Sequence, residues 1–207
     1  MKKLQVGVLG SGHGSNLRAI VEACKNADFP ARVVIVLSDV ADSGCLRIAH
    51  EHGIPSRYIA PGKFRTRLEP EIEEQYVAAL RDAGVELVGL AGYMRIVKEP
   101  LLKAYAGRIM NIHPSLLPAF RGLEAWKQAL SVGAKMTGCT VHFIDEDTDT
   151  GPIILQAQVP ILKGDTPESL HARIQEQEYR LYPEAIRLFA EGALRIEGRN
   201  VKILNQR

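Results

Sequence analysis

Apolar and polar residues follow two different periods along the first hundred positions. Val, Ile and Leu form nearly continuous runs at Lys3–Leu9 and Ala31–Leu37, which is typical of parallel strands buried on both faces. Between these runs, residues 16–27 show helical spacing, with Ser15 and Asn16 as candidate N-caps. Strands that alternate with helices predict a parallel sheet joined by right-handed crossovers.

The same patterns predict the remaining elements. Helices are expected at residues 44–53, 68–83, 123–132 and 168–191, and strands at 55–59, 86–90, 108–112, 139–144 and 152–161, with a terminal hairpin over 194–204. Two strands in the second half follow each other without a helix, so they are expected to pair antiparallel. The predicted fold class is therefore α/β: a doubly wound, Rossmann-like, mostly parallel sheet with antiparallel C-terminal additions.

The composition is that of an ordinary globular chain, with 46% hydrophobic and 24% charged residues. Without an internal repeat or a low-complexity linker, a single domain over 1–207 is predicted, with a phosphate-binding half at 1–105 and a catalytic half at 106–207. The 26 basic and 24 acidic residues leave no strong field of one sign, which argues against a nucleic-acid partner. Since no apolar run reaches the roughly 20 residues of a membrane span, we expect a cytoplasmic protein without membrane contact.

A glycine-rich loop, Gly10–Asn16, joins the first predicted strand to the first helix. Glycines let a backbone approach a ligand closely, and a helix N-terminus presents N–H groups to an anion. The loop is neither a dinucleotide fingerprint, because Ser15 replaces the third glycine, nor a P-loop. Asp39, just past the second strand, could still mimic a ribose-binding acid, so a dinucleotide enzyme stays open, as does a turn without ligand. We favour a phosphate monoester with sugar hydroxyls.

A second group of polar residues lies at the end of the predicted strand 108–112. Asn111 and His113 fall on one face of this strand, and Pro114 ends it. Both side chains are therefore expected at the carboxyl end of a parallel strand, where open α/β sheets bind their ligands. An amide donor beside a histidine suits acid–base chemistry at a developing negative charge.

Four carboxylates gather in the acidic loop 145–151. The loop begins like a calcium loop but has Thr150 where glycine is required, and the three cysteines of the chain form no C-x-x-C pair, so no metal is expected. Asp149 is the acid most constrained by its neighbours, and it could orient His113. Together with Asn111, and without a G-x-S-x-G nucleophile, these residues suit direct acyl transfer through a tetrahedral intermediate.

Four motifs follow one another along the chain: Gly12-His-Gly-Ser-Asn16, Leu90-Ala-Gly-Tyr-Met-Arg-Ile96, Asn111-Ile-His-Pro-Ser-Leu-Leu-Pro118 and Thr148-Asp-Thr-Gly-Pro152. In order and spacing they resemble the folate-dependent formyltransferase family over nearly the whole chain. The resemblance implies that the amine of glycinamide ribonucleotide attacks the formyl group of 10-formyltetrahydrofolate, the co-substrate, in purine biosynthesis. It implies no metal.

The resemblance also implies a role for each matching residue. Asn111 would hold the oxyanion, His113 would stabilise it as an imidazolium, and Asp149 would keep His113 protonated and accept the amine proton through water. The residues implied for the ribonucleotide are Gly14, Ser15, Asn16 and Glu178, and those implied for the folate are Arg67, Met94, Arg95, Ile96, Val97, Asn111, His142 and Asp145. For His142, a packed structural role stays open.

The chain departs from the family pattern at Phe120-Arg121-Gly122, where many members that act on glycinamide ribonucleotide have proline before the glycine. Arginine at this place resembles members that formylate methionyl-tRNA, although a near-neutral chain is poorly suited to grip tRNA. Formyl transfer to methionyl-tRNA or an amino sugar, and a sugar-phosphate-binding module without catalysis, stay open as alternatives. We expect small-molecule partners and a monomer or homodimer.

Overall fold

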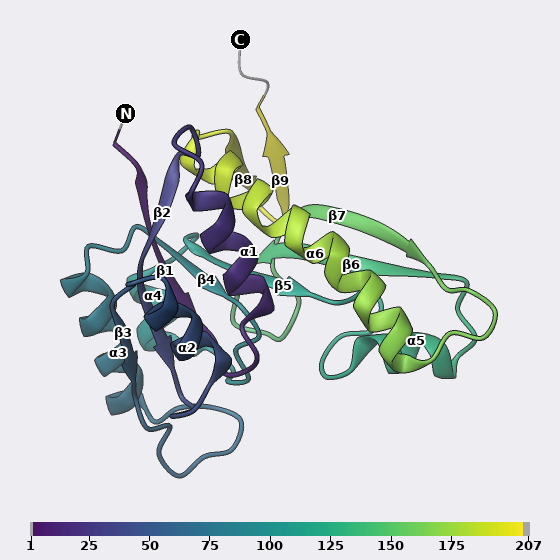
Figure 1. Cartoon of the computed structure of the whole chain (residues 1–207), viewed down its shortest axis with the longest axis horizontal. Helices are drawn as coiled ribbons and strands as arrows, with labels where there is room; N and C mark the ends of the chain where they lie inside the picture. The colour runs from purple at the N-terminus through teal and green to yellow at the C-terminus, as the bar shows by residue number, and fades with distance from the viewer. Residues whose placement is uncertain (1, 205–207) are drawn as a thin grey trace. The chain divides into compact units, whose positions relative to one another are not determined.

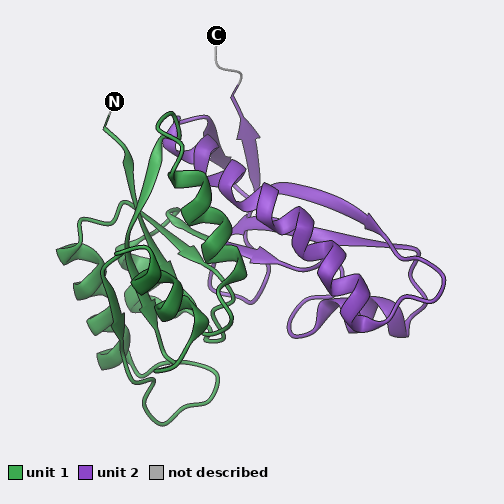
Figure 2. Ribbon diagram, in the orientation of Figure 1, with its two compact units in different colours: residues 1–110 green, residues 111–207 purple. Residues whose placement is uncertain are grey.

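The structure is a computed structural model that describes residues 2–204 (Figure 1). The chain divides into two compact units, residues 1–110 and 111–207 (Figure 2). Among the described residues, no helix is both long and apolar enough to cross a membrane.

The first unit is built on parallel strands in the order β3-β2-β1-β4. These are β1 (Leu4–Leu9), β2 (Ala31–Ser38), β3 (Ser56–Tyr58) and β4 (Leu87–Leu90). β1 lies between β2 and β4, and its Val6, Val8 and Leu9 have no exposed surface. A continuous apolar run is therefore explained by a central strand that is covered on both faces.

Four helices complete the first unit: α1 (Ser15–Cys24), α2 (Gly44–Glu51), α3 (Pro70–Asp82) and α4 (Glu99–Ala104). α1 and α2 pack against β2, whereas α3 packs against α4. Because the strand order turns back after β3, right-handed crossovers place α3 on the opposite face of the sheet from α1 and α2. This is the predicted doubly wound arrangement. The short α4 was not predicted, because six residues show too little periodicity.

The second unit has the strand order β6-β7-β9-β8. Its elements are α5 (Ala125–Ser131), β6 (Met136–Phe143), β7 (Ile153–Pro160), α6 (Pro167–Ala190), β8 (Leu194–Glu197) and β9 (Asn200–Ile203), and the boundary with the first unit falls inside β5 (Ile109–His113). β6 and β7 pair antiparallel and β8 and β9 form the hairpin, as predicted. α6 packs on β6 and β7 over a core of Cys139, Val159, Leu170 and Ile174.

Three predicted element ends were wrong. α1 ends at Cys24 rather than at residue 27. The N-cap of α1 is Gly14 in the left-handed conformation (φ 82°), not Ser15 or Asn16. β6 begins at Met136 rather than at 139, and Gly138 lies within it. A Cβ at Gly138 would lie 1.9 Å from the carbonyl oxygen of Ala157 on the paired strand, so the glycine allows a close approach of the two strands.

Candidate active site

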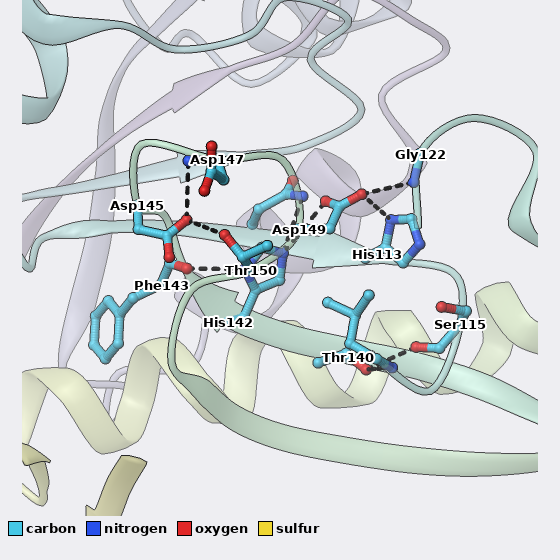
Figure 3. A network of polar contacts seen from close by, with 12 residues as sticks. His113, Ser115, Gly122, Thr140, His142, Phe143, Asp145, Asp147, Asp149 and Thr150 are labelled. Atoms are coloured by element: carbon cyan, nitrogen blue, oxygen red, sulfur yellow. Dashed lines mark hydrogen bonds and ion pairs between the residues drawn. The ribbon is translucent and has the colours of Figure 1, made fainter. Parts of the chain in front are cut away.

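His113, the last residue of β5, is buried with 5% of its surface exposed, and both of its ring nitrogens face protein oxygens. Nε2 lies 2.8 Å from the carbonyl oxygen of Phe120, and Nδ1 lies 3.4 Å from Oδ2 of Asp149 (Figure 3). A carbonyl oxygen only accepts, so Nε2 carries a proton. A carboxylate likewise offers only an acceptor to Nδ1, so a doubly protonated ring matches both contacts.

Asp149 is held in place from several sides, although it lies in an acidic loop. Its Oδ2 accepts a hydrogen bond from the backbone N–H of Gly122 at 2.9 Å, and its Oδ1 lies 3.7 Å from Nε2 of His142. Its backbone has a φ of 54°, a left-handed conformation that a non-glycine residue adopts at some cost in energy. The structure thus brings the carboxylate of Asp149 to His113.

The loop around Asp149 is shaped by its own side chains. Asp145 accepts hydrogen bonds from the hydroxyl of Thr150 (2.6 Å) and from the backbone N–H of Asp147 (3.3 Å). Gly151 packs so closely on β6 that a Cβ there would lie 1.8 Å from the carbonyl oxygen of Phe143. The carboxylate of Asp145 therefore organises the loop. Residues 2–204 contain no group of three or more His, Cys, Asp or Glu residues placed to hold a metal ion.

Asn111 and His142 form a second contact in the same unit. The amide Nδ2 of Asn111 lies 3.4 Å from Nε2 of His142, whose Nδ1 lies 2.8 Å from the carbonyl oxygen of Phe143. Burial lowers the pKa of His142, so the ring is neutral near pH 7, with its proton on Nδ1. The unprotonated Nε2 then accepts a hydrogen bond from the Asn111 amide. The Asn111 side chain is therefore oriented with its NH₂ group, and not its carbonyl oxygen, toward His142.

Thr140 and Gln156 support this site, and sequence analysis did not single them out. The Thr140 hydroxyl donates to the carbonyl oxygen of Ser115 (2.7 Å) and accepts from the backbone N–H of Leu117 (3.1 Å) and from Nε2 of Gln156 (2.9 Å). These contacts tie the segment after His113 to β6 and β7. Buried polar side chains that alternate with apolar ones in a strand are the only signal the sequence offers for such a role.

The glycine loop of the first unit has the backbone geometry of a close-packed turn. A Cβ on Gly14 would lie 2.7 Å from Ile48, and one on Gly10 would lie 2.4 Å from the thiol sulfur of Cys45. Gly14 has no side chain to cap α1, and the first turn that follows, Ser15-Asn16-Leu17, carries no acid. A helix N-terminus of this kind suits an anion.

The residues implied for the folate fall into two groups. In the first unit, Arg67 forms a β-bridge with Ile96, and the backbone N–H of Ile96 donates to the carbonyl oxygen of Thr66. Met94 and Ile96 are exposed, whereas Val97 is buried, so Val97 offers a ligand little beyond its backbone. His142 and Asp145 lie in the second unit, in the contacts described above. Glu178 is buried on α6 of that unit. Desolvation is the main cause of the raised pKa of the Cys139 thiol, and the charge of Glu178 raises that pKa further.

An amide and an imidazole near the carboxyl end of β5, a second imidazole on β6 and a carboxylate in the loop that follows β6 define a site for acyl or one-carbon group transfer. Comparison with known proteins agrees with this class. The family model for formyl transferases matches residues 4–186, so the chain belongs to the formyl transferase family.

Individual relatives extend over most of the chain. It is 42% identical to phosphoribosylglycinamide formyltransferase of Haemophilus influenzae over 197 residues, which cover 95% of this chain and 91% of the relative. It is 41% identical over 202 residues to the human trifunctional purine biosynthetic protein adenosine-3. The chain spans about a fifth of the length of such trifunctional relatives. Glycinamide ribonucleotide transformylase 1 from Symbiobacterium toebii has the same fold, with a TM-score of 0.94 and 52% identity over 98% of this chain and 95% of that one.

Proposed function

We propose that this protein transfers the formyl group of 10-formyltetrahydrofolate to the amine of 5'-phosphoribosylglycinamide, in purine biosynthesis. The observation that carries the proposal is the joint arrangement of Asn111, His113 and Asp149, which combines an oxyanion donor with a carboxylate-paired imidazole. The printed names of relatives that match the chain along most of their own length support the choice of acceptor.

The reaction is an addition followed by an elimination at the formyl carbon. The substrate amine forms a C–N bond to that carbon, and the carbonyl oxygen becomes an oxyanion that accepts a hydrogen bond from the Asn111 amide and is stabilised by the positive charge of the His113 imidazolium. Asp149 keeps His113 protonated and takes the proton of the amine through water. The bond from the formyl carbon to N10 of the folate then breaks, and N10 leaves with a proton as tetrahydrofolate. The electron pair on the oxyanion re-forms the carbonyl bond, so the transfer needs no oxidant or reductant.

The remaining roles follow the same assignment. The glycine loop, through Gly14, Ser15 and Asn16, binds the phosphate of the ribonucleotide, and Glu178 contacts its ribose or amine. The folate contacts Arg67, Met94, Arg95, Ile96, Val97, Asn111, His142 and Asp145. The chain acts as one domain over 1–207, with a phosphate-binding half at 1–105 and a catalytic half at 106–207. It works in the cytoplasm as a monomer or homodimer.

The test is an absorbance assay of folate conversion with one acceptor at a time. Purified protein receives 10-formyltetrahydrofolate with glycinamide ribonucleotide, with methionyl-tRNA, with an amino sugar, or with water alone. Turnover that requires the ribonucleotide is the expected result. Turnover with another acceptor, or with water alone, would overturn the assigned acceptor and leave the formyl chemistry. Folate binding without turnover in any mixture would overturn catalysis itself.

A further inference from the structure

Asp39, directly after β2, is a buried carboxylate for which the proposed reaction has no use. Its side chain is only 2% exposed, and both of its oxygens have partners in the first unit. The Ser11 hydroxyl donates to Oδ1 at 2.5 Å, and Nε of Arg95 donates to Oδ2 at 2.6 Å. Both oxygens of this buried carboxylate are engaged within the protein, which speaks against the alternative in which Asp39 binds a ribose.

Each side chain that contacts Asp39 also makes a hydrogen bond with the backbone of another residue. Besides its contact with Asp39, the Arg95 guanidinium donates through Nη1 to the carbonyl oxygen of Phe64 at 2.7 Å and to that of Arg65. The Ser11 hydroxyl, whose proton points to Asp39, accepts from the backbone N–H of Met94 at 2.9 Å. Asp39 therefore contacts two side chains, those of Ser11 and Arg95, that tie the segment 94–97 to the glycine loop and to residues 64–65.

We propose that Asp39 is a positioning residue for folate binding, acting through Ser11 and Arg95 on the backbone of residues 94–97. The inference rests on the proposed function, in which this segment lines the folate site. Val97 is buried, so the segment recognises a ligand through its backbone and through the exposed side chains of Met94 and Ile96. A small shift of that backbone is therefore expected to change folate affinity more than the chemical step.

The chemistry of Asp39 makes asparagine the informative substitution. An amide has nearly the same shape as a carboxylate but offers one acceptor and one donor group instead of two acceptors. Whichever way the amide turns, its NH₂ faces either the Ser11 hydroxyl or Nε of Arg95, and both of those are donating toward it. One partly buried donor then loses its acceptor, and the negative charge beside the guanidinium is lost as well.

The chain offers a matched control in Asp165, a carboxylate that anchors a loop in the second unit. Its side chain is 5% exposed, and it accepts from Arg173 at 2.5 Å and from the backbone N–H of Leu162 at 2.7 Å. Asp165→Asn therefore removes the same charge from a similar Asp–Arg pair, without touching the segment 94–97. It reports what loss of such a pair does to the fold alone.

Steady-state kinetics on the full chain compare Asp39→Asn with Asp165→Asn. We expect Asp39→Asn to raise the KM for 10-formyltetrahydrofolate about tenfold, the size of one lost hydrogen bond to a charged group, with kcat and the ribonucleotide KM changed by less than about threefold. Asp165→Asn should leave all three constants near those of the wild type. A folate KM that moves no further in Asp39→Asn than in Asp165→Asn overturns the proposal.

A second readout does not depend on activity. Amide hydrogen exchange at Met94 and Ile96 should quicken by about tenfold or more in Asp39→Asn and stay unchanged in Asp165→Asn, because only the first substitution loosens the backbone at those amides. Should Asp39→Asn fail to fold, Ser11→Ala, which keeps the Asp39–Arg95 pair, carries the same test with a smaller expected rise in the folate KM.

The double variant Ser11→Ala/Asp39→Asn separates a shared path from general destabilisation. If Asp39 acts partly through Ser11, the two effects on the folate KM are less than additive; full additivity would contradict that path. The proposal and the proposed function also fail differently. A wild-type protein that cannot use 10-formyltetrahydrofolate overturns the function, whereas a wild type that uses it, with Asp39→Asn unchanged in folate KM and exchange, overturns only the role of Asp39.

Discussion

At the scale of single residues, two imidazoles of one unit have different surroundings. His142 is fully buried, which lowers its pKa, and its Nδ1 proton goes to a backbone carbonyl, so its Nε2 acts as an acceptor. His113 faces a carbonyl oxygen at one nitrogen and a carboxylate at the other. One ring thus orients the Asn111 amide, while the other lies beside the carboxylate of Asp149.

Replacing His113 with alanine is expected to lower kcat for formyl transfer by about 10²- to 10⁴-fold, the usual contribution of a general acid–base group. Folate and ribonucleotide dissociation constants should change far less, because the substitution removes a group that acts mainly on the developing oxyanion. Single-turnover kinetics and equilibrium binding measure the two effects separately. Asp147→Asn, which removes an exposed acid from the nearby loop, serves as the control. Equal losses of binding and catalysis in His113→Ala would contradict the assigned role.

The lowered pKa of His142 predicts how stability depends on pH. Below its ordinary value of 6.5, the unfolded chain binds a proton on this ring that the folded chain still refuses, so stability falls as pH falls. Nearby Asp149 and Asp145 favour the charged ring and His113 opposes it, but desolvation is the largest effect. Between pH 7 and pH 5.5, the wild type should lose up to about 1.4 kcal/mol per pH unit more than His142→Gln. Urea unfolding of the wild type and of His142→Gln at several pH values tests this. Equal losses of stability in the two proteins as the pH falls would refute it.

At the scale of elements, the segment after β5 is held by hydrogen bonds from neighbouring strands rather than by its own secondary structure. Thr140 of β6 contacts Ser115 and Leu117, and Gln156 of β7 joins it by donating to the Leu117 carbonyl oxygen at 3.0 Å. The Ser115 hydroxyl donates in turn to the carbonyl oxygen of Ala119 at 2.5 Å. Two strands therefore shape the loop whose backbone contacts His113 and Asp149.

Two threonines on β6 give a matched test of this support. Thr140→Val keeps the shape but leaves the Leu117 N–H and the Ser115 carbonyl without their partner, so unfolding free energy should fall by about 1–3 kcal/mol. Thr137 is equally buried, yet its hydroxyl has no hydrogen-bond partner in the part of the chain that the structure describes. Thr137→Val should therefore be neutral or stabilising. Chemical denaturation of both variants decides; equal losses would mean that the Thr140 hydrogen bonds contribute little.

At the scale of the whole molecule, the chain combines a parallel α/β unit with a mainly antiparallel one, and the boundary between them falls inside β5. Asn111 and His113 follow that boundary, while the glycine loop and residues 93–97 precede it. The proposed phosphate-binding half, 1–105, and the proposed catalytic half, 106–207, meet close to this boundary. If the two halves form one domain, they should unfold together in a single cooperative transition.

Trp126, the one tryptophan of the chain, offers a probe of the second unit by itself. Its ring stacks on His171 with centroids 3.8 Å apart, so its fluorescence should change when that unit unfolds. Far-UV circular dichroism reports helices of both units. If the chain is one domain, the two signals should give one coincident urea transition. Separate midpoints would show two independently folding domains instead.

The sequence by itself determined the order and type of nearly all elements, because continuous apolar runs and helical periodicity are local signals of burial. It also placed Asn111 and His113 on one strand face, since strand side chains alternate. The tertiary structure decided what local pattern does not carry. The left-handed Gly14 cap and the close approach at Gly138 depend on segments that are distant in sequence, and the network around the buried carboxylate of Asp39, with Ser11 and Arg95, joins three separate segments. The neutral state of His142 likewise follows from desolvation, which exists only once the fold has closed around it.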